Sequence, residues 1–416
     1  MYIRPSATSV TSANGPNPLY AYPVICYAVS MQYKRAYQYR CYPTPDQAAI
    51  LARTFGSARF VYNWGLSLRT DAWYEQHKRV GYHETSAALT ELKRQPETAW
   101  LNEVSSVPPQ QALRHLDRAF RNFFEGRSKY PTFKKNHDRQ AAEYTASAFK
   151  WDAATRTLTL ARMNDVSLRI RWSRPFTGTP TTITISRDHA GRYFVSFLVE
   201  EEIGMLPVLE TAVGVDVGIQ ALATLSTGEH IASPKHLARH HKHLKRAQQA
   251  LNRKQLGSKN REKARRKVAR LHTQIADQRL DCLHKLTTRL IRENQTICVE
   301  SLAVKNMVRN HKLARSISDA AWGELVRQLT YKAAWYGRTL AKIDKWYPSS
   351  KRCSVCGHTL TSLPLAVRDW TCPACRTHHD RDVNAAKNIC AVGLTVLACG
   401  EMVRPAKASA RAGASR

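Results

Sequence analysis

The segment TAVGVDVGIQALATLSTG places one carboxylate, Asp216, in a mostly apolar run, with Gly214 and Gly218 two residues away on either side. A buried carboxylate without a partner is costly, so such a group stays near the surface or meets a positive partner such as a metal ion. The pattern around it predicts a strand, a tight turn and a second strand, with Asp216 on the first strand. We therefore expect a cationic partner for Asp216.

Two other segments supply candidate carboxylates. QTICVESLAVKNM predicts a short apolar strand with Glu300 at its end, and HHDRDVNAAKNICAVGL predicts a helix start with Asp380 and Asp382 in or beside the first turn. If the two strand acids and one helix acid converge in an RNase H-like sheet, they can ligate two divalent cations, which clamp the attacking water and the leaving oxygen of a phosphodiester displacement. Oxygen ligands and a phosphate substrate favour Mg²⁺ or Mn²⁺.

Each of these acids also has an ordinary structural interpretation. Glu300 can be an exposed strand end, and Asp380 or Asp382 can be a helix N-cap. A DVG strand turn occurs as well in phosphate-binding ATPases with a related sheet, which include sugar kinases. That alternative predicts further glycine-rich loops for phosphate and adenosine, and the sequence contains none.

The segment CSVCGHTLTSLPLAVRDWTCPAC has the spacing C-x2-C-x15-C-x2-C, by which two thiolate turns meet around one tetrahedral zinc ion. Four thiolates close the coordination shell, so the zinc would be structural. The nearby His358, His378 and His379 are not needed as ligands, and we expect them in loops or facing nucleic acid. The expected zinc ligands are Cys353, Cys356, Cys372 and Cys375.

Composition indicates the class of partner. The chain has 416 residues, which suggests two or three domains, and it carries 64 Lys and Arg against 32 Asp and Glu, a formal charge of +32. A positive field of this size concentrates polyanions, and nucleic acid is the leading candidate, although a ribosomal or heparin-binding protein would have the same excess of positive charge.

The cysteines indicate the compartment. Ten cysteines in so long a chain are not a dense disulfide framework and favour a reducing, cytoplasmic compartment.

The N-terminal half combines strands and helices. MQYKRAYQYRCYP predicts a strand from Met31, and TPDQ then predicts a capping box with Thr44 as N-cap and Gln47 as its partner, ahead of a long helix. A second helix near SVPPQQALRHLDRAFRNFF has an apolar stripe that is most simply core: Leu113, Leu116, Phe120 and Phe123.

Residues 144 to 200 change to a period of two, which predicts a small antiparallel sheet or barrel into which the preceding helices are inserted. VSLRIRW alternates an apolar set, Val166, Leu168, Ile170 and Trp172, with Ser167, Arg169 and Arg171. The segments TTITISRD and RYFVSFLVEEE continue the pattern.

Residues 235 to 292 hold 18 Lys or Arg against three acids and predict a basic helical hairpin, with Ser233-Pro234 at its start and Gly257 between its two helices. The hairpin is either a solvated charged face or a phosphate-binding surface, and the shortage of neutralising acids favours phosphate. The candidate nucleic-acid-binding residues are Lys235, Arg239, Lys242, Lys245, Arg246, Arg253, Lys254, Arg265, Arg266, Lys267 and Arg270.

The two ends of the chain differ from the rest. No apolar run is long enough for a membrane span, and the first 30 residues make a poor signal peptide, so we expect a disordered extension or a misassigned start there. The last residues, RPAKASARAGASR, are small and basic and are expected to be disordered.

Taken in order, these motifs resemble the TnpB family of insertion-sequence proteins, RNA-guided nucleases related to type V CRISPR effectors. The resemblance covers residues 31 to 405 and rests on RCYPTPDQAAILARTFGSARFVYNWGL, YPTFKK, VGVDVGIQALATL, VESLAVKNM, NHKLARSISDAAWGELVRQLTYKAAWYG, YPSSKRCSVCG, WTCPACRTHHDRDVNAAKNI and ACGEMVRP. The extension before Met31 is not part of the family pattern.

The resemblance implies an α/β multidomain fold: an N-terminal wedge β-barrel with an inserted helical recognition bundle, then an RNase H-like (RuvC-like) nuclease domain with an inserted zinc finger. The implied boundaries are an extension at 1–30, the barrel at 31–45 and 127–206, the helical insertion at 46–126, the nuclease at 207–349 with the hairpin at 234–292, the zinc finger at 350–378, the C-terminal nuclease part at 379–403 and the tail at 404–416.

The resemblance also implies a function. The catalytic acids of the family fall on Asp216, Glu300 and Asp382, with Asp380 as an accessory candidate; the cofactors are two Mg²⁺ (or Mn²⁺) ions, a structural Zn²⁺ and a guide RNA from the transposon end. The target is double-stranded DNA, cut beside a short transposon-associated motif, in a prokaryotic cytoplasm at the nucleoid, with the element's transposase as a functional partner.

Two alternatives remain from other classes of function. A catalytically silent RNA-guided regulator would bind its target without cutting it, and the presence of all three acids disfavours it. An unguided zinc-ribbon protein would bind nucleic acid with a strong salt dependence and no requirement for one RNA.

Overall fold

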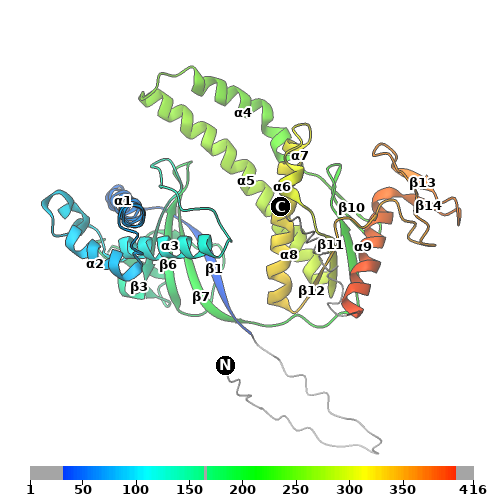
Figure 1. The fold of residues 1–416 in the computed structure, drawn as a ribbon, viewed down its shortest axis with the longest axis horizontal. Coiled ribbons are helices and arrows are strands. Elements are labelled where there is room, and N and C mark those ends of the chain that lie inside the picture. The colour runs from blue at the N-terminus through cyan, green and yellow to red at the C-terminus, as the bar shows by residue number, and fades with distance from the viewer. Residues whose placement is uncertain (1–30, 164–165, 400–416) are drawn as a thin grey trace, which may run out of the picture.

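The computed structural model describes residues 31–163 and 166–399, so the expectations for residues 1–30 and 404–416 lie outside the described part. Two five-stranded sheets organise this part of the chain, and helices pack against both (Figure 1). None of the described helices combines the length and the apolar character needed to span a membrane.

The first sheet is antiparallel and has the strand order β2-β6-β7-β1-β5. Its core is rich in aromatic rings, among them Tyr39, which packs edge-on against both Trp172 and Phe197. A small hairpin, β3 and β4, follows a single turn of 3₁₀ helix, η2. The bounds are β1 Met31–Cys41, β2 Gln140–Thr145, η2 Ala146–Ala148, β3 Phe149–Asp152, β4 Thr157–Leu160, β5 Ile170–Arg171, β6 Pro180–Arg187 and β7 Tyr193–Ile203.

A helical insertion separates β1 from the rest of this sheet. It consists of α1 Pro45–Gln76, α2 Tyr82–Leu92, the 3₁₀ helix η1 Pro96–Glu103 and α3 Val107–Phe124. The predicted capping box is confirmed, because Thr44 Oγ1 accepts from the Gln47 amide and the Gln47 side chain accepts from the Thr44 amide. The apolar stripe of α3 is buried as expected at Leu113, Leu116 and Phe120.

The predicted alternation after residue 165 is only partly right. Leu168 is buried, and Ile170 and Trp172 are half-buried against the sheet core, but Val166 is 52% exposed, so its inward assignment is wrong. Only Ile170–Arg171 pair with β1, which leaves the residues before them without a ladder that would fix which way they face.

The second sheet has the order β10-β9-β8-β11-β12, with β8, β11 and β12 parallel and β9 and β10 antiparallel. Its strands are β8 Ala212–Asp216, β9 Ala221–Leu225, β10 His230–Ala232, β11 Thr296–Glu300 and β12 Thr339–Ile343. The helices that follow are α4 His236–Asn252, α5 Lys259–Glu293, α6 Val304–Met307, α7 Ala314–Ala320, α8 Trp322–Tyr336 and α9 Arg381–Ala398.

Opposite faces of this sheet pack against different helices. Val213 and Val215 of β8 share one core with Leu286 of α5 and Leu325 of α8. On the other face, Cys298 of β11 packs against α9. Since side chains alternate along a strand, Asp216 and Glu300 belong to the α9 face, together with Gly214 and Cys298.

The basic hairpin formed by α4 and α5 is confirmed and projects away from both sheets (Figure 1). A small apolar cluster that includes Leu244, Ala247 and Val268 joins its two helices. Its first helix begins at His236, two residues after the Ser233-Pro234 signal, and Gly257 in the connection has a φ of 80°.

The two halves of the described chain contact each other through polar and aromatic side chains. Tyr33 Oη of β1 donates to the Ala334 carbonyl of α8 at 2.7 Å, and the Arg35 guanidinium lies over the Trp335 ring. Arg192, just before β7, bonds Asp277 of α5 at 2.5 Å. The N-terminal sheet is thereby tied to the helices that cover the second sheet.

Helix α9 packs so closely on the second sheet that two glycines are required. A Cβ at Gly214 of β8 would overlap the Ala386 carbonyl oxygen and lie 2.7 Å from the Cys390 backbone nitrogen. A Cβ at Gly393 of α9 would lie 2.7 Å from the Cβ of Cys298 on β11. The atoms that an added Cβ would meet belong to the α9 backbone or to the buried Cys298 side chain, so they have no room to move.

This packing predicts that Gly214→Ala strongly destabilises the fold, since it forces α9 off β8. Gly56→Ala is the matched control, because Gly56 lies inside α1 with nothing within 4 Å of an added Cβ, and the loss of a helical glycine should stabilise by about 0.5–1 kcal/mol. Thermal unfolding of both variants checks the contrast; equal melting temperatures would contradict the packing account.

Candidate metal centres and nucleic-acid interface

Two of the predicted carboxylates lie at the same edge of the second sheet. Strands β8 and β11 are parallel neighbours, and their register pairs Val215 with Val299. The next residues, Asp216 and Glu300, therefore lie side by side at the carboxyl ends of both strands. Ligands in open α/β sheets bind at this edge.

Helix α9 brings the third carboxylate to this edge. Ala386 and Cys390 flank Gly214, and Asp382 lies one turn before Ala386. The four residues from Asp382 to Ala386 advance about 6 Å along the helix, which is close to the distance from Gly214 to Asp216 along an extended strand. The charges of both Glu300 and Asp382 act on the pKa of Asp216, so the three predicted acids lie near one another at this edge of the sheet.

Burial and the two neighbouring acids both disfavour the ionised form of Asp216. Burial, followed by the charges of Glu300 and Asp382, raises the pKa of Asp216 to about 8, and the nearby Arg381 and Arg368 offset only part of the rise. Burial and like charges both disfavour an ionised carboxyl. A cation bound at this point would offset both effects. The expected cationic partner of Asp216 would therefore be a metal ion at this edge of the sheet.

Glu300 and Asp382 each have a partner that the sequence did not indicate. Ser349 Oγ donates to Glu300 Oε1 at 2.5 Å, which lowers the Glu300 pKa against the larger raising effect of burial. Arg368 Nη1 lies 3.4 Å from Asp382 Oδ1. The Ser349 hydroxyl contacts only one oxygen of Glu300, whereas Arg368 Nη1 also lies 3.5 Å from Asp382 Oδ2 and so contacts both oxygens of Asp382.

Asp380 has a structural role. It is the N-cap of α9, and its Oδ1 accepts from the Val383 amide at 2.8 Å. Its other oxygen lies 3.7 Å from His230 Nε2 of β10. The N-cap interpretation is thus confirmed for Asp380, and its accessory metal role remains a prediction.

The four predicted zinc ligands form a compact cluster. The Sγ atoms of Cys353, Cys356, Cys372 and Cys375 all lie within 4.8 Å of one another, and two of the S···S distances are 3.6 Å. A tetrahedral ion with Zn–S bonds of about 2.3 Å requires S···S distances of about 3.8 Å, so the donor set fits zinc. No other group in the described residues is this compact, and the three carboxylates lie further apart.

His379 supports this cluster from inside the zinc finger. His379 is 7% exposed, its ring centroid lies 4.8 Å from that of Trp370 in a tilted arrangement, and its Nε2 lies 3.0 Å from Cys353 Sγ. The expectation that His379 faces nucleic acid is therefore wrong. His379 is the middle residue of β14 His378–Asp380, which pairs with β13 Asp369–Thr371. The alternation of side chains along β14 turns His379 inward and leaves His378 exposed.

Two buried asparagines of α9 connect the zinc finger to the carboxylates. Asn384 and Asn388, four residues apart on one helix face, both donate to the carbonyls of Ser349 and Arg352. They hold the segment that leads into the finger, and with it the Ser349 hydroxyl that bonds Glu300. The NAAKN spacing was visible in the sequence, but its partners were not.

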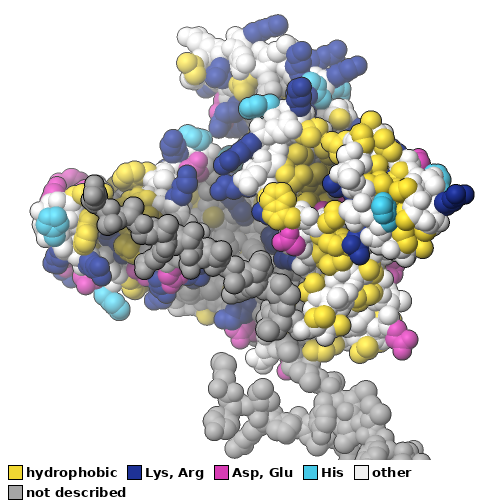
Figure 2. Space-filling view, turned by 45° about the vertical axis from the view of Figure 1, so that its right-hand side comes forward, with side chains coloured by type: hydrophobic (Ala, Val, Ile, Leu, Met, Phe, Trp, Pro, Cys, Tyr) yellow, Lys and Arg dark blue, Asp and Glu magenta, His cyan; other side chains and the backbone are white. Residues whose placement is uncertain are grey.

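The predicted basic residues are confirmed as exposed, and Lys and Arg side chains gather on the projecting hairpin in Figure 2. Arg265 and Arg266 form ion pairs with Glu262, at 2.9 and 3.3 Å. The same two arginines line a cleft of about 330 Å³ between the start of α5, helix α1 and the β6–β7 turn.

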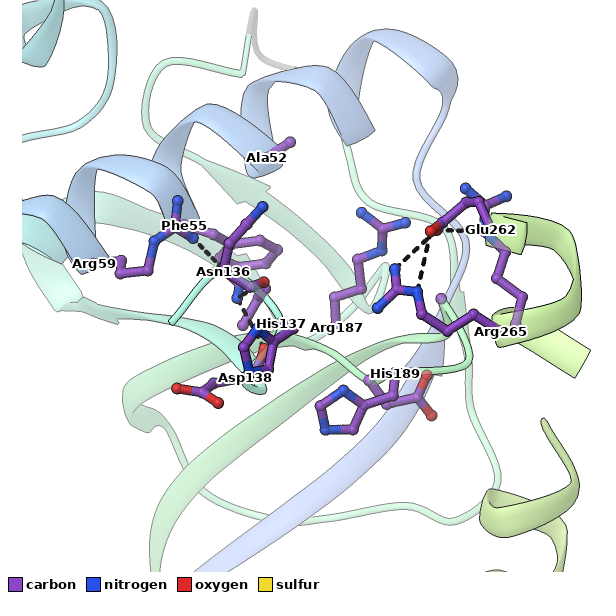
Figure 3. A pocket seen from close by; sticks show the side chains of 14 residues that line it. Ala52, Phe55, Arg59, Asn136, His137, Asp138, Arg187, His189, Glu262 and Arg265 are labelled. Carbon is purple, nitrogen blue, oxygen red and sulfur yellow. Dashed lines mark hydrogen bonds and ion pairs between the residues drawn. The ribbon is translucent and has the colours of Figure 1, made fainter. Parts of the chain in front are cut away.

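Figure 3 shows the side chains that converge on this cleft from both halves of the chain. Arg59 of α1 bonds Gln140, and Arg187 of β6 lies over the Tyr193 ring. The acids Asp138 and Asp188 also line it, so the cleft is basic but partly neutralised.

The chain is similar to known proteins over most of its length. It is 57% identical over 387 residues to a protein of Streptomyces pristinaespiralis named "Putative RNA-guided DNA endonuclease", with 92% of this chain and 95% of the relative covered. A protein of Escherichia coli K12, "Putative RNA-guided DNA endonuclease InsQ", is 35% identical, with 90% and 96% covered. The chain belongs to the TnpB family.

Family models match three segments of this TnpB-family chain. A "Probable transposase" model matches residues 196–311, a "Cas12f1-like, TNB domain" model matches 322–389, and a "Helix-turn-helix domain" model matches 31–78. The last segment consists here of strand β1 and the single continuous helix α1. The first two contain Asp216 with Glu300 and Asp382 with the zinc ligands, respectively.

A solved structure extends the likeness to the fold. The "Cryo-EM structure of the Cas12f1-sgRNA-target DNA complex" aligns with a TM-score of 0.55 and 15% identity, over 83% of each chain. At this identity the likeness shows a Cas12f1-like fold with mixed helices and strands.

The raised pKa of Asp216 predicts a pH-dependent effect of Asp216→Asn on stability. In the unfolded chain this carboxyl ionises near pH 4, but in the folded chain only near 8, so its ionisation costs folding free energy that grows between these values. Without divalent cations the variant should melt above the parent at pH 8, by a margin that shrinks towards pH 5. Added Mg²⁺ should stabilise the parent more than the variant.

Asp369→Asn is the control, because Asp369 is exposed on β13. Thermal melts of the three proteins from pH 5 to 8.5, in chelator and in Mg²⁺, give the comparison. A pH-independent difference between Asp216→Asn and the parent would contradict the electrostatic account.

The cysteine cluster predicts bound zinc. Cys353→Ser removes a ligand and should release about one zinc per chain and lower the melting temperature, because a structural zinc contributes to folding. Cys399→Ser, at an exposed free cysteine, should retain the metal. Metal analysis by mass spectrometry tests this, and equal zinc content in both variants would count against the site.

Proposed function

We propose that this TnpB-family chain is an RNA-guided DNA endonuclease encoded by an insertion sequence, which cuts double-stranded DNA beside a short transposon-associated motif. The names of its relatives support guidance and DNA cleavage at the level of the family. The observation that carries the proposal is the convergence of Asp216, Glu300 and Asp382, from β8, β11 and α9, on one edge of the sheet.

The proposed catalytic residues are Asp216, Glu300 and Asp382, which would hold two Mg²⁺ or Mn²⁺ ions. Their oxygen donors suit these ions, and a bound cation would offset the cost of ionising the buried Asp216. When bound, such ions supply an activated water and stabilise charge on the scissile phosphate. Ser349 would orient Glu300, and Arg368 would hold Asp382 beside the ions.

The domain assignment follows from the same proposal. The first sheet with residues 31–45 and 127–206 would be the wedge barrel, residues 46–126 the recognition insertion, and residues 207–349 with 379–403 the RuvC-like nuclease around the zinc finger at 350–378. The order of the elements agrees with this division.

The basic surfaces would hold the nucleic acids. A guide–target duplex is recognised by its shape and its phosphates, while base pairing supplies the sequence. The eleven exposed Lys and Arg of the hairpin and the cleft beside α1 suit the phosphate part of this task. Guide RNA from the transposon end and target DNA would be the direct partners, with the element's transposase a functional one, in the cytoplasm at the nucleoid.

Alanine variants of the three acids separate binding from cutting. Asp216→Ala, Glu300→Ala and Asp382→Ala should each reduce the rate of target cleavage at least a hundredfold, with guide RNA binding within twofold of the parent, because they remove only metal ligands. Asp369→Ala, at an exposed acid of the zinc finger, should cut normally. Single-turnover cleavage and RNA filter binding provide the two readouts.

The alternatives give different results in the same assays. Normal cutting by Asp216→Ala would refute the assignment of that residue. A parent that binds its target but leaves it uncut in excess Mg²⁺ would indicate a silent regulator. Binding that follows salt concentration and ignores RNA identity would indicate an unguided protein.

A further inference from the structure

An aromatic groove of about 720 Å³ lies on the helical insertion, away from the carboxylates and the zinc finger. It is formed by the C-terminal ends of α1 and α3 and by the segments that follow them. Six aromatic side chains line this groove: Trp73, Tyr74, Phe120, Phe123, Phe124 and Tyr130.

The outer rings of the aromatic groove are open to solvent. Tyr74 and Phe124 are 73% and 75% exposed, and Trp73 and Tyr130 are 46% and 41% exposed. Large apolar side chains gathered in this way on a surface commonly mark a binding site. Tyr130 is held in place, since it packs edge-on against Phe120 and Phe123 at centroid distances of 5.5 and 5.3 Å.

The charged residues of the aromatic groove are all positive. Arg69, Lys78 and Arg79 line it, and no acid does. Arg69 is held in place, because it bonds Asp117 at 3.2 Å and lies 4.1 Å over the Phe120 ring. Lys78 and Arg79 are exposed and make no ion pair within the described part of the chain, so both are available to an anion.

We propose that the aromatic groove binds unpaired nucleotides, with bases stacked on its exposed rings and phosphates on Lys78 and Arg79. Aromatic faces beside cations are the usual platform for single strands, because every base offers a face to stack on. A paired duplex hides these faces and would leave the rings unused. The inference rests on the proposed function for the source of the strand, but it concerns a site separate from the carboxylates.

A second copy of the chain is a poorer occupant of the aromatic groove. A two-fold interface places the same patch on both partners, so the cations of one groove would face those of the other without an acid between them. A nucleotide strand brings both the apolar faces and the negative charge that the groove lacks.

Photocrosslinking with the full chain locates the strand. The probes are 12-nucleotide oligothymidylate carrying 5-iododeoxyuridine and oligouridylate carrying 5-iodouridine. We expect crosslinks in the tryptic peptides 70–78 and 122–127, which contain Trp73, Tyr74, Phe123 and Phe124. The two probes distinguish a DNA strand from an RNA segment, and crosslinks from either support the groove.

An affinity measurement tests the same site by substitution. Tyr74→Ala/Phe124→Ala should weaken binding of the preferred oligonucleotide about tenfold or more, at a salt concentration that suppresses purely ionic binding. Phe133→Ala/Trp346→Ala is the matched control, because it removes two rings of 56% and 81% exposure outside the groove and should change affinity less than threefold. Unchanged melting temperatures establish that both variants fold.

Several results would overturn the proposal. Crosslinks confined to other peptides, or equal affinities for the two double variants, would exclude the aromatic groove as a strand site. A dimer in sedimentation velocity that Tyr74→Ala/Phe124→Ala dissociates would assign the groove to a second copy. If the protein proved to bind no guide RNA and to cut no DNA, the proposed function would fail. Crosslinks in the aromatic groove under those conditions would still support the strand site.

Discussion

The burial of one carboxylate, Asp216, beside two other acids is the constraint around which the C-terminal half of this chain is built. Burial is the main cause that raises the pKa of Asp216, and the charges of Glu300 and Asp382 raise it further. A fold does not bring acids together in this way for stability, because ionisation of the group costs folding free energy. The arrangement is explained if a cation is the intended partner, and the surrounding structure must then hold the acids in place until it arrives.

The close approach of α9 to the sheet does this holding. Gly214 and Gly393 let the helix lie directly on β8 and β11, which sets Asp382 opposite the strand ends. From the same helix, Asn384 and Asn388 fasten the Ser349–Arg352 segment that carries the Ser349 hydroxyl to Glu300 and leads into the zinc finger. The zinc finger and the carboxylates thus share one scaffold.

Much of this could be predicted from the sequence, where the signals are local. The Thr44 capping box, the α4–α5 hairpin and the two C-x2-C pairs each involve neighbouring residues with one dominant structural outcome. The strand and helix patterns indicated Asp216, Glu300 and the pair Asp380 and Asp382, and the family resemblance selected Asp382 from that pair. Contacts between distant segments could not be read in advance: nothing near Arg368 or Ser349 in the chain indicates Asp382 or Glu300. Val166 was misassigned because no strand pairing fixes the residues before Ile170, and His379 was misassigned because its pairing in the β13–β14 hairpin turns it inward.

We propose that a bound RNA directs metal-dependent cutting by this chain. The most direct measurement is to purify the protein from cells that contain its flanking DNA, sequence the RNA that accompanies it, and supply targets matched to the terminal segment of that RNA. The account predicts one discrete transcript and Mg²⁺-dependent cleavage that moves to a new site when that segment is changed. Heterogeneous cellular RNA, with no cleavage that follows the guide, would contradict it and leave charge alone as the basis of binding.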